Sequence, residues 1–380
     1  MLRTACIKLS TSPEQFTALL TLRSAYADVC NRLVPLVLEH RCWNRVALHR
    51  HSYSRLRAEL ALGSQMTCNA IFSVCKAYRA QAALGRIGAG KPLPCIHFKQ
   101  ASVHYDKRTY RFVGESLSLY TLRGRTIVGM RLGDHQRRIL ESGRVREADL
   151  ILRRGRWFFN VAVESKDPEL IISGPVMGVD VGENTLAATS TGKVFGGERL
   201  RDRRDRYLAQ RRRLQSNGSQ SAKQKLRQVS GREKRRTRQI NHETSKAIVG
   251  EAAKHGITKI VLEDLTHIRT RINAGRRLRG RLHRWPFRQL QSFIEYKARA
   301  VGIDVIYVDP AYTSKTCSGC AALGKRERHS FVCGLCGLRA HADLNASRNL
   351  ARIGGTAVPP RVIVNAPYVE DLGCKAQVLR

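Results

Sequence analysis

The 380-residue sequence is short of acidic residues and of long apolar runs. It has 30 Asp and Glu against 68 Lys and Arg, which gives a formal net charge of +38. A field of that sign attracts a polyanion, and nucleic acid is the partner that this composition favours. No apolar stretch approaches the length of about 18 residues that a membrane span needs, and the N-terminus lacks the apolar core of a signal peptide. We therefore expect no membrane partner, although a basic membrane-surface protein is the alternative that composition alone would allow.

Cysteines with paired spacing occur in one short stretch. Cys317/Cys320 and Cys333/Cys336 are two Cys-x-x-Cys pairs separated by twelve residues. Each pair can turn two sulfurs toward one side of an ion, which is the arrangement that tetrahedral Zn²⁺ needs. A closed shell of four thiolates predicts one structural zinc ion, against the alternative of four unrelated buried cysteines. The remaining seven cysteines read as reduced thiols, so we expect a cytoplasmic protein, associated with the nucleoid.

The N-terminal half changes from a helical to a strand period. Residues 2–9 alternate as one short strand, and a helical pattern opens at Pro13 and is expected to stop at Pro35. A second apolar stripe over 66–78 predicts another helix. From 96 to 163 the period is two, with glycines where turns are expected. We interpret this half as an antiparallel, barrel-like β domain closed by the N-terminal strand, with a basic helical bundle inserted in it.

The C-terminal half has a more definite order of elements. Strands are predicted first, then a long polar helical region broken near Asn217 and Gly218, and then alternating strands and helices up to the cysteine-rich segment. This is a ribonuclease H-like arrangement, in which the first strand, the fourth strand and the last helix meet at one edge of the sheet. The predicted elements are strands at 177–182, 186–190, 193–195, 259–264 and 304–309, and helices at 199–253, around 290–298 and at 342–353.

One carboxylate falls on each of the three elements that meet. Asp180, Glu263 and Asp343 cannot all stay ionised side by side without a counter-charge, and Mg²⁺ suits such oxygen ligands. Two ions about 3.5–4 Å apart could support hydrolysis of a phosphodiester, with Asp180 as the bridging ligand. Each residue also has a structural alternative. Asp180 could be a strand-edge residue, and Asp264 could be the catalytic acid in place of Glu263. Asp343 could serve only to stabilise a helix N-terminus.

Two arginine-rich stretches lie between the predicted catalytic elements. Residues 199–238 contain sixteen Lys and Arg residues against three acidic ones, and residues 269–288 contain eight Arg and no acidic residue. Arg-rich runs at a chain end are usually solvated tails, but these are internal, which favours a channel for a nucleic-acid duplex without base readout. The candidate contacts are Arg199, Arg203, Arg206, Arg232, Arg235, Arg236, Arg276 and Arg277.

Several motifs together resemble the TnpB family, which comprises RuvC-like proteins of insertion-sequence transposons and is related to type V CRISPR effectors. The segments MGVDVG, KIVLEDL and HADLNASRNLA, with the cysteine-rich stretch between the last two, carry the match over about 176–352. The resemblance implies a multidomain α+β chain. Its parts would be a wedge-type antiparallel β-barrel domain (1–10 and 92–165) with an inserted helical recognition domain (11–91), a linker (166–175), a RuvC-like nuclease domain (176–310 and 341–354), a four-Cys zinc ribbon (311–340) and a mostly disordered tail (355–380).

The resemblance also implies an activity, that of an RNA-guided DNA endonuclease. A guide RNA from the transposon end would select a double-stranded DNA target beside a short adjacent motif. The three acids and four cysteines carry over as the Mg²⁺ and Zn²⁺ ligands, and Arg326 or Arg328 of the ribbon could steady the scissile phosphate. Ser347 stands where the family usually has Ala. An RNA-guided repressor, an unguided RuvC-like nuclease or transposase and a CRISPR-associated variant are the alternatives, and monomer and dimer are both open.

Overall fold

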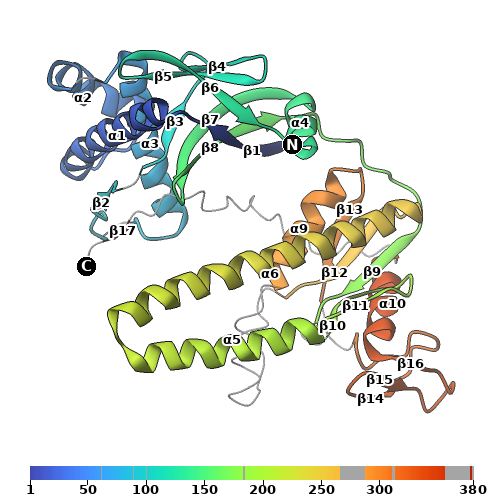
Figure 1. Ribbon diagram of the computed structural model, residues 1–380. Coiled ribbons are helices and arrows are strands. Elements are labelled where there is room, and N and C mark those ends of the chain that lie inside the picture. Colours follow the sequence, from blue (N-terminus) through green and yellow to red (C-terminus); the bar gives the residue numbers. More distant parts are fainter. Residues whose placement is uncertain are drawn as a thin grey trace. The chain divides into compact units, whose positions relative to one another are not determined.

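The computed structural model describes residues 1–60, 62–88, 90–99, 101–182, 185–265, 287–309, 313–355 and 377–378, with only the backbone at 198–201 and 377–378. The chain divides into two compact units. The first is Met1–Lys166 with Pro367–Arg380, and the second is Asp167–Ala366 (Figure 1). The predicted mixed architecture, with an antiparallel sheet in the N-terminal half, is confirmed.

The first unit is built around a nearly closed antiparallel sheet of seven strands. The N-terminal strand lies in the middle of the sheet order β3-β7-β8-β1-β6-β5-β4, where it pairs with both β8 and β6. Alternate residues of the strands, such as Ile7, Phe159 and Val161, are fully buried, so one face of the sheet forms the core. The strands are β1 (Leu2–Ser10), β3 (Val103–Tyr105), β4 (Tyr110–Val113), β5 (Ser116–Thr121), β6 (Gly124–Arg131), β7 (Arg144–Arg153) and β8 (Arg156–Glu164).

Three long helices follow β1 in sequence: α1 (Pro13–His40), α2 (Arg45–Glu59) and α3 (Ser64–Ala83). A capping box starts α1, because Ser12 Oγ accepts from the Gln15 backbone N–H and Gln15 Oε1 accepts from the Ser12 N–H. The expected stop at Pro35 is wrong, since the helix continues to His40. Pro35 removes one helical hydrogen bond, and burial of Leu33, Val34 and Val37 on the core face offsets this loss. The shorter helix α4 (Asp134–Glu141) was not predicted.

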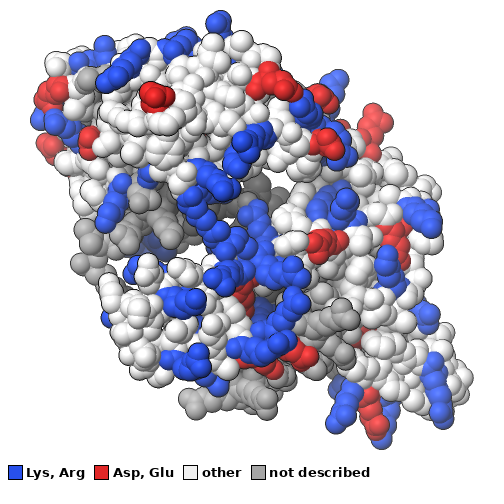
Figure 2. All heavy atoms as spheres, viewed as in Figure 1, with Lys and Arg blue, Asp and Glu red and all other residues white. Residues whose placement is uncertain are grey.

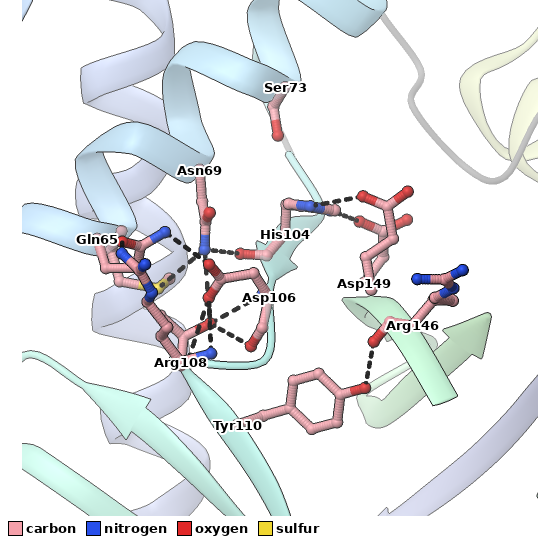
Figure 3. Close-up of polar contacts among 12 residues, drawn as sticks. Gln65, Asn69, Ser73, His104, Asp106, Arg108, Tyr110, Arg146 and Asp149 are labelled. Carbon is pink, nitrogen blue, oxygen red and sulfur yellow. Dashed lines mark hydrogen bonds and ion pairs between the residues drawn. The ribbon is translucent and has the colours of Figure 1, made fainter. Parts of the chain in front are cut away.

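A buried polar cluster joins α3 to the sheet (Figure 3). His104 on β3 is 5% exposed in its side chain, and its two ring nitrogens lie 3.0 Å from Asp149 and 3.1 Å from Glu147. The side-chain amide of Asn69 donates to the backbone oxygen of His104 (3.3 Å). Burial alone would lower the pKa of His104, but hydrogen bonds and charge from the two carboxylates outweigh it and raise the pKa. The two carboxylates therefore favour the protonated form of His104.

The second unit contains a five-stranded sheet of order β11-β10-β9-β12-β13. The first three strands form an antiparallel meander, whereas β12 is parallel to both β9 and β13. Buried residues such as Met177, Ile260 and Leu262 join it to the helices. The strands are β9 (Val176–Asp180), β10 (Thr185–Thr189), β11 (Val194–Gly196), β12 (Lys259–Glu263) and β13 (Asp304–Val308).

Two long helices, α5 (Glu198–Asn217) and α6 (Gln220–Lys254), form an antiparallel hairpin between β11 and β12 (Figure 1). The predicted break is confirmed: Gly218 has φ +66°, a left-handed conformation that glycine adopts without strain, and Ser219 caps α6. In contrast to the polar α5, the C-terminal half of α6 buries Ile248 and Val249 against the sheet. The helix α9 (Phe287–Arg299) packs against the same core.

The C-terminal part of the second unit consists of a small three-stranded sheet and the helix α10 (Ala342–Gly355). The small sheet has the order β14 (Lys325–Glu327), β15 (Ser330–Val332) and β16 (Arg339–His341). Of the predicted tail, the structure describes Gly355 and a two-residue strand, β17 (Gln377–Val378), which pairs with β2 (Ile96–His97). The rest of the predicted tail lies outside the described residues.

Among the helices that the structure describes, none combines the length and the apolar character needed to cross a membrane.

Candidate active site and metal centre

Two parallel strands bring Asp180 and Glu263 to the same edge of the sheet. The register of β9 and β12 pairs Val179 with Leu262. Asp180 and Glu263 are the next residue on each strand, and both end their strands. Because parallel neighbours in register present their side chains to the same face, the two carboxylates lie side by side. The structure therefore places Glu263, and not the following residue Asp264, beside Asp180.

The helix α10 supplies the third carboxylate, because it lies directly against β9. Gly178, two residues before Asp180, has no side chain, and a Cβ there would overlap the backbone oxygen of Ser347. This close approach lets the helix bring Asp343, in its first turn, toward the strand ends. Ser347, the departure from the family pattern, is fully buried and donates its hydroxyl to the backbone oxygen of Leu344 within the helix.

The three carboxylates influence one another strongly. Burial, with the charges of Glu263 and Asp343, raises the pKa of Asp180 well above its ordinary value, and Arg326 opposes the rise only in part. Burial also raises the pKa of Glu263, against a hydrogen bond from Thr313 and the charge of Arg326. Such a group of partly buried carboxylates, which Arg326 balances only in part among the residues that the structure describes, fits a divalent cation. The role of the three acids as ligands stays a prediction.

Two residues from outside the sheet hold the carboxylates in place. The hydroxyl of Thr313 donates to Glu263 Oε1 (2.8 Å), and Nη2 of Arg326 on β14 donates to Asp343 Oδ1 (2.7 Å). Of the two arginines considered from sequence, Arg326 is therefore the one in contact with the acids. Arg328 offers its backbone oxygen to Arg326 Nε at 3.4 Å. Thr313 was missed, because a threonine in an irregular segment carries no periodic signal.

The four paired cysteines converge in the small three-stranded sheet. The Sγ atoms of Cys317 and Cys336 are 3.6 Å apart, those of Cys320 and Cys333 are 3.5 Å apart, and all four lie within 4.8 Å of one another. Tetrahedral coordination at about 2.3 Å places sulfurs ~3.8 Å apart, so these residues fit Zn²⁺ closely. Hydrogen bonds from backbone N–H groups, Cys336 first, lower the pKa of Cys333, whereas hydrogen bonds with the other three thiols raise the pKa of Cys336. The four sulfurs therefore share protons that a metal ion would displace.

Two asparagines of α10 tie the cysteine cluster to the carboxylates. Asn345 accepts from the Ser318 backbone N–H (2.9 Å) and donates to the backbone oxygen of Thr316 (2.7 Å). Asn349, one turn later, donates to the backbone oxygens of Thr313 and Thr316. Both asparagines are fully buried. Sequence reasoning missed them, although their i, i+4 spacing on a helix that begins at a candidate ligand was a usable signal.

The predicted basic contacts have different outcomes. Arg203 and Arg206 on α5 are exposed, as are Arg232, Arg235 and Arg236 on α6. Figure 2 shows one face of the molecule, on which the blue lysine and arginine side chains predominate over the red acidic ones. Arg199 lies in α5 with an undescribed side chain, and Arg276 and Arg277 lie outside the described residues. Their binding of nucleic acid stays a prediction.

The chain is similar in sequence to proteins of known families. A TnpB-like protein of Methanocaldococcus jannaschii is 30% identical over 282 residues, which cover 68% of this chain and 99% of that protein. The chain belongs to the TnpB-like family. Two family models also match this TnpB-like chain: one described as a probable transposase over residues 159–269, and one described as the Cas12f1-like TNB domain over residues 287–350.

More distant relatives of the TnpB-like chain are CRISPR-associated proteins. The CRISPR-associated endodeoxyribonuclease Cas12f1 of Sulfoacidibacillus thermotolerans is 31% identical over 219 residues, 52% of this chain and 50% of that protein, so the match spans about half of its length. Among solved structures, a cryo-EM structure of CasPhi-2 (Cas12j) bound to crRNA covers 95% of this chain and 99% of that one. Its TM-score of 0.50 at 10% identity indicates a likeness of fold alone.

Proposed function

We propose that this TnpB-like chain is an RNA-guided DNA endonuclease of transposon origin, which hydrolyses DNA phosphodiesters at Asp180, Glu263 and Asp343. The observation that carries the proposal is the meeting of these three carboxylates at one sheet edge, where burial and mutual repulsion raise the pKa of Asp180 and Glu263. The names of the relatives, an RNA-guided DNA endonuclease and several CRISPR-associated endodeoxyribonucleases, support the same function. Among the described residues, three carboxylates face one guanidinium, and an acid cluster with a purely structural role would gain nothing from that repulsion.

The second unit would be a RuvC-like nuclease domain with an inserted zinc ribbon. Its strand order, with an antiparallel meander extended by two parallel strands, supports a ribonuclease H-like fold. In the first unit, the seven-stranded sheet would be the wedge-type domain, and the three long helices α1, α2 and α3 would be the recognition domain. We assign the ribbon a structural Zn²⁺ on its four cysteines, since a closed thiolate shell leaves no position for substrate.

At the site, the three carboxylates would hold two Mg²⁺ ions, with Asp180 shared between them. When bound there, Mg²⁺ would activate a water molecule and stabilise the leaving oxygen. The chain's own residues position that chemistry. Thr313 fixes one oxygen of Glu263, and Arg326 restrains Asp343 and brings a guanidinium that can also contact a phosphate. The zinc ribbon holds Arg326 in place, because β14 pairs with β15 inside it.

Guide RNA and double-stranded DNA are the proposed partners. Exposed arginines lie along the two long helices α5 and α6. Arginines arranged in this way can contact a phosphate backbone without reading bases. Base pairing between guide and target would then select the sequence, and the protein would hold the heteroduplex by its shape and charge.

The test begins with the RNA that the protein carries. The full chain is purified from cells that contain its native locus, and the bound RNA is sequenced. We expect one discrete species with a constant scaffold and a segment that runs past the boundary of the transposon. A plasmid that carries the matching target should then be cleaved in Mg²⁺ by the wild type and not by Asp180→Ala.

Each alternative predicts a different result in this test. A guided repressor would bind the target without cutting it and would be indifferent to Asp180→Ala. An unguided nuclease or transposase would carry heterogeneous RNA or none and would still lose activity in Asp180→Ala. Cleavage that survives the substitution would contradict the assignment of the site.

A further inference from the structure

Two histidines lie beside Asp343 on the side opposite to Arg326. His329 is in the turn between β14 and β15, and His341 ends β16 just before α10 begins. Their rings are stacked, with centroids 5.4 Å apart and planes inclined by 29°. The backbone oxygen of His329 accepts from the Ala342 N–H (2.8 Å), which fixes the turn against the start of α10. The ribbon and the helix therefore place both imidazoles next to the candidate catalytic acid.

The two oxygens of Asp343 have different neighbours. Oδ1 accepts from Arg326 (2.7 Å), whereas Oδ2 lies 4.0 Å from Nδ1 of His329 and 4.0 Å from Nδ1 of His341. Nδ1 of His341 accepts a long hydrogen bond from the Asp343 backbone N–H (3.3 Å), so this nitrogen carries a lone pair in the neutral ring. An ion bound between this nitrogen and Asp343 Oδ2, which are 4.0 Å apart, would replace the long backbone hydrogen bond as the partner of that lone pair.

The spacing of these three atoms is close to that of a metal shell. Nitrogen and oxygen ligands at about 2.1 Å from a divalent ion lie roughly 3–3.5 Å from one another. All three ligand atoms lie within 4.8 Å of one another here, so the rings would have to close by about 1 Å around an ion. The side chains of His329 and His341 are 48% and 32% exposed, which gives an ion a path from solvent and gives the rings room to turn. Asp343 itself is buried and held by Arg326, so it can serve as the fixed ligand.

The ligand types distinguish this position from the one beside Asp180 and Glu263. Those two residues offer oxygen alone, which suits Mg²⁺. Two imidazoles with one carboxylate instead favour first-row transition ions, because imidazole nitrogen binds them more strongly than it binds Mg²⁺. Open coordination positions would remain for water or for an oxygen of the substrate.

We propose that His329, His341 and Asp343 form a binding site for a divalent transition-metal ion such as Fe²⁺ or Zn²⁺, joined to the proposed nuclease site through Asp343. The inference rests on the proposed function only for the role of Asp180 and Glu263. The three ligands themselves are brought together by the ribbon and α10, whatever reaction the chain performs.

Pulsed electron paramagnetic resonance with Mn²⁺ as the probe tests the proposal directly, because it detects ¹⁴N nuclei bound to the ion. The full chain, with its ribbon zinc retained, receives Mn²⁺ below one equivalent. We expect coupling to two imidazole nitrogens in the wild type, to one in His329→Gln or His341→Gln, and to none in the double variant. Mn²⁺ affinity should fall by at least about tenfold with each ligand lost. His255→Gln is the matched control, since His255 is an exposed histidine at the end of α6.

Two outcomes would overturn the inference: Mn²⁺ that binds the wild type without imidazole coupling, and coupling that persists in the double variant. Mn²⁺ ions on copurified RNA give the same background in the wild type and in the double variant. The spectrum of the double variant is therefore subtracted from that of the wild type. The Asp180→Asn variant separates this inference from the proposed function. It should keep both nitrogen couplings while it loses cleavage, and loss of the couplings in that variant would contradict the independence of the histidine site.

Discussion

The two units of the chain handle buried charge in opposite ways. In the first unit, the buried His104 has one carboxylate beside each ring nitrogen, from Glu147 at 3.1 Å and from Asp149 at 3.0 Å. In the second unit, Asp180, Glu263 and Asp343 meet, and among the described residues the Arg326 guanidinium opposes the rise in the pKa of Asp180 and Glu263. Within the described part of the chain, the first cluster sets one imidazolium against two carboxylates, whereas the second sets one guanidinium against three.

This difference separates a structural cluster from a functional one. A buried ion pair that balances its own charge holds elements together, and its net contribution to stability is small. An unbalanced cluster costs stability in the isolated chain and is useful only if something outside the chain, here a cation, supplies the missing charge. Substitutions in the two clusters should therefore change stability in opposite directions.

The largest effect is expected for Asp180→Asn. Loss of a hydrogen-bonded neighbour of a metal ligand typically costs 10–100-fold in activity, so loss of a direct ligand should reduce guided cleavage by more than about 100-fold. Stability should rise at neutral pH in Mg²⁺-free buffer, because the folded pKa of Asp180 is raised. The cost of ionising it is absent below the unfolded pKa of about 3.9 and is fully present above the folded value. Thermal unfolding at pH 4 and pH 8 measures this, and equal effects at both would contradict the account.

Gly178→Ala tests how closely α10 must approach β9. The new methyl group would overlap the backbone oxygen of Ser347, so the helix would have to move and carry Asp343 with it. We expect a loss of about 3 kcal/mol in the free energy of unfolding, together with reduced cleavage. Gly250→Ala is the control, because a Cβ there meets nothing within 4 Å and α6 should gain about 0.5–1 kcal/mol. Denaturant unfolding of the two variants compares them.

His104→Gln breaks the buried polar cluster of the first unit. Two carboxylates would lose their cationic partner, and we expect a loss of about 1–3 kcal/mol near pH 6. The folded pKa of His104 is raised, so its contribution is complete below about pH 6.5 and is lost as the pH rises through the folded value. The difference between wild type and variant should therefore shrink with rising pH. A constant difference from pH 6 to pH 9 would show that His104 acts through packing rather than charge.

The smallest effects are expected on the surface of α5. Arg203→Gln or Arg206→Gln should weaken RNA and DNA binding without changing the fold, because both side chains are exposed. Each should reduce the slope of log affinity against log salt by about 1 if it contacts one phosphate. Arg203→Lys keeps the charge and should keep the slope. Unchanged slopes in both glutamine variants would remove these two arginines from the interface.

Much of the second unit was readable from sequence because each element carries its own signal. Asp180 lies in a buried apolar strand, although the strand ends at Asp180 and not at the predicted residue 182. Cys317 and Cys333 begin paired motifs, and the helix break at Gly218 needs a left-handed residue. The residues that were missed act through tertiary contacts. Thr313 reaches Glu263 across fifty residues of sequence, and Asn345 satisfies the backbone of the ribbon. The error at Pro35 has the same cause, since burial of the helix outweighed a local rule.

The most direct test of the central claim compares two neighbouring acids. Glu263 lies in the carboxylate cluster, whereas Asp264 follows it after the strand has ended, with its backbone N–H donating to Val308 (2.7 Å). Single-turnover cleavage of a guided target in Mg²⁺ is measured for Glu263→Gln and Asp264→Asn. The account predicts that Glu263→Gln loses cleavage by more than about 100-fold and that Asp264→Asn stays within about tenfold of the wild type. The reverse order, or equal activity of the two variants, would contradict the assignment of the site.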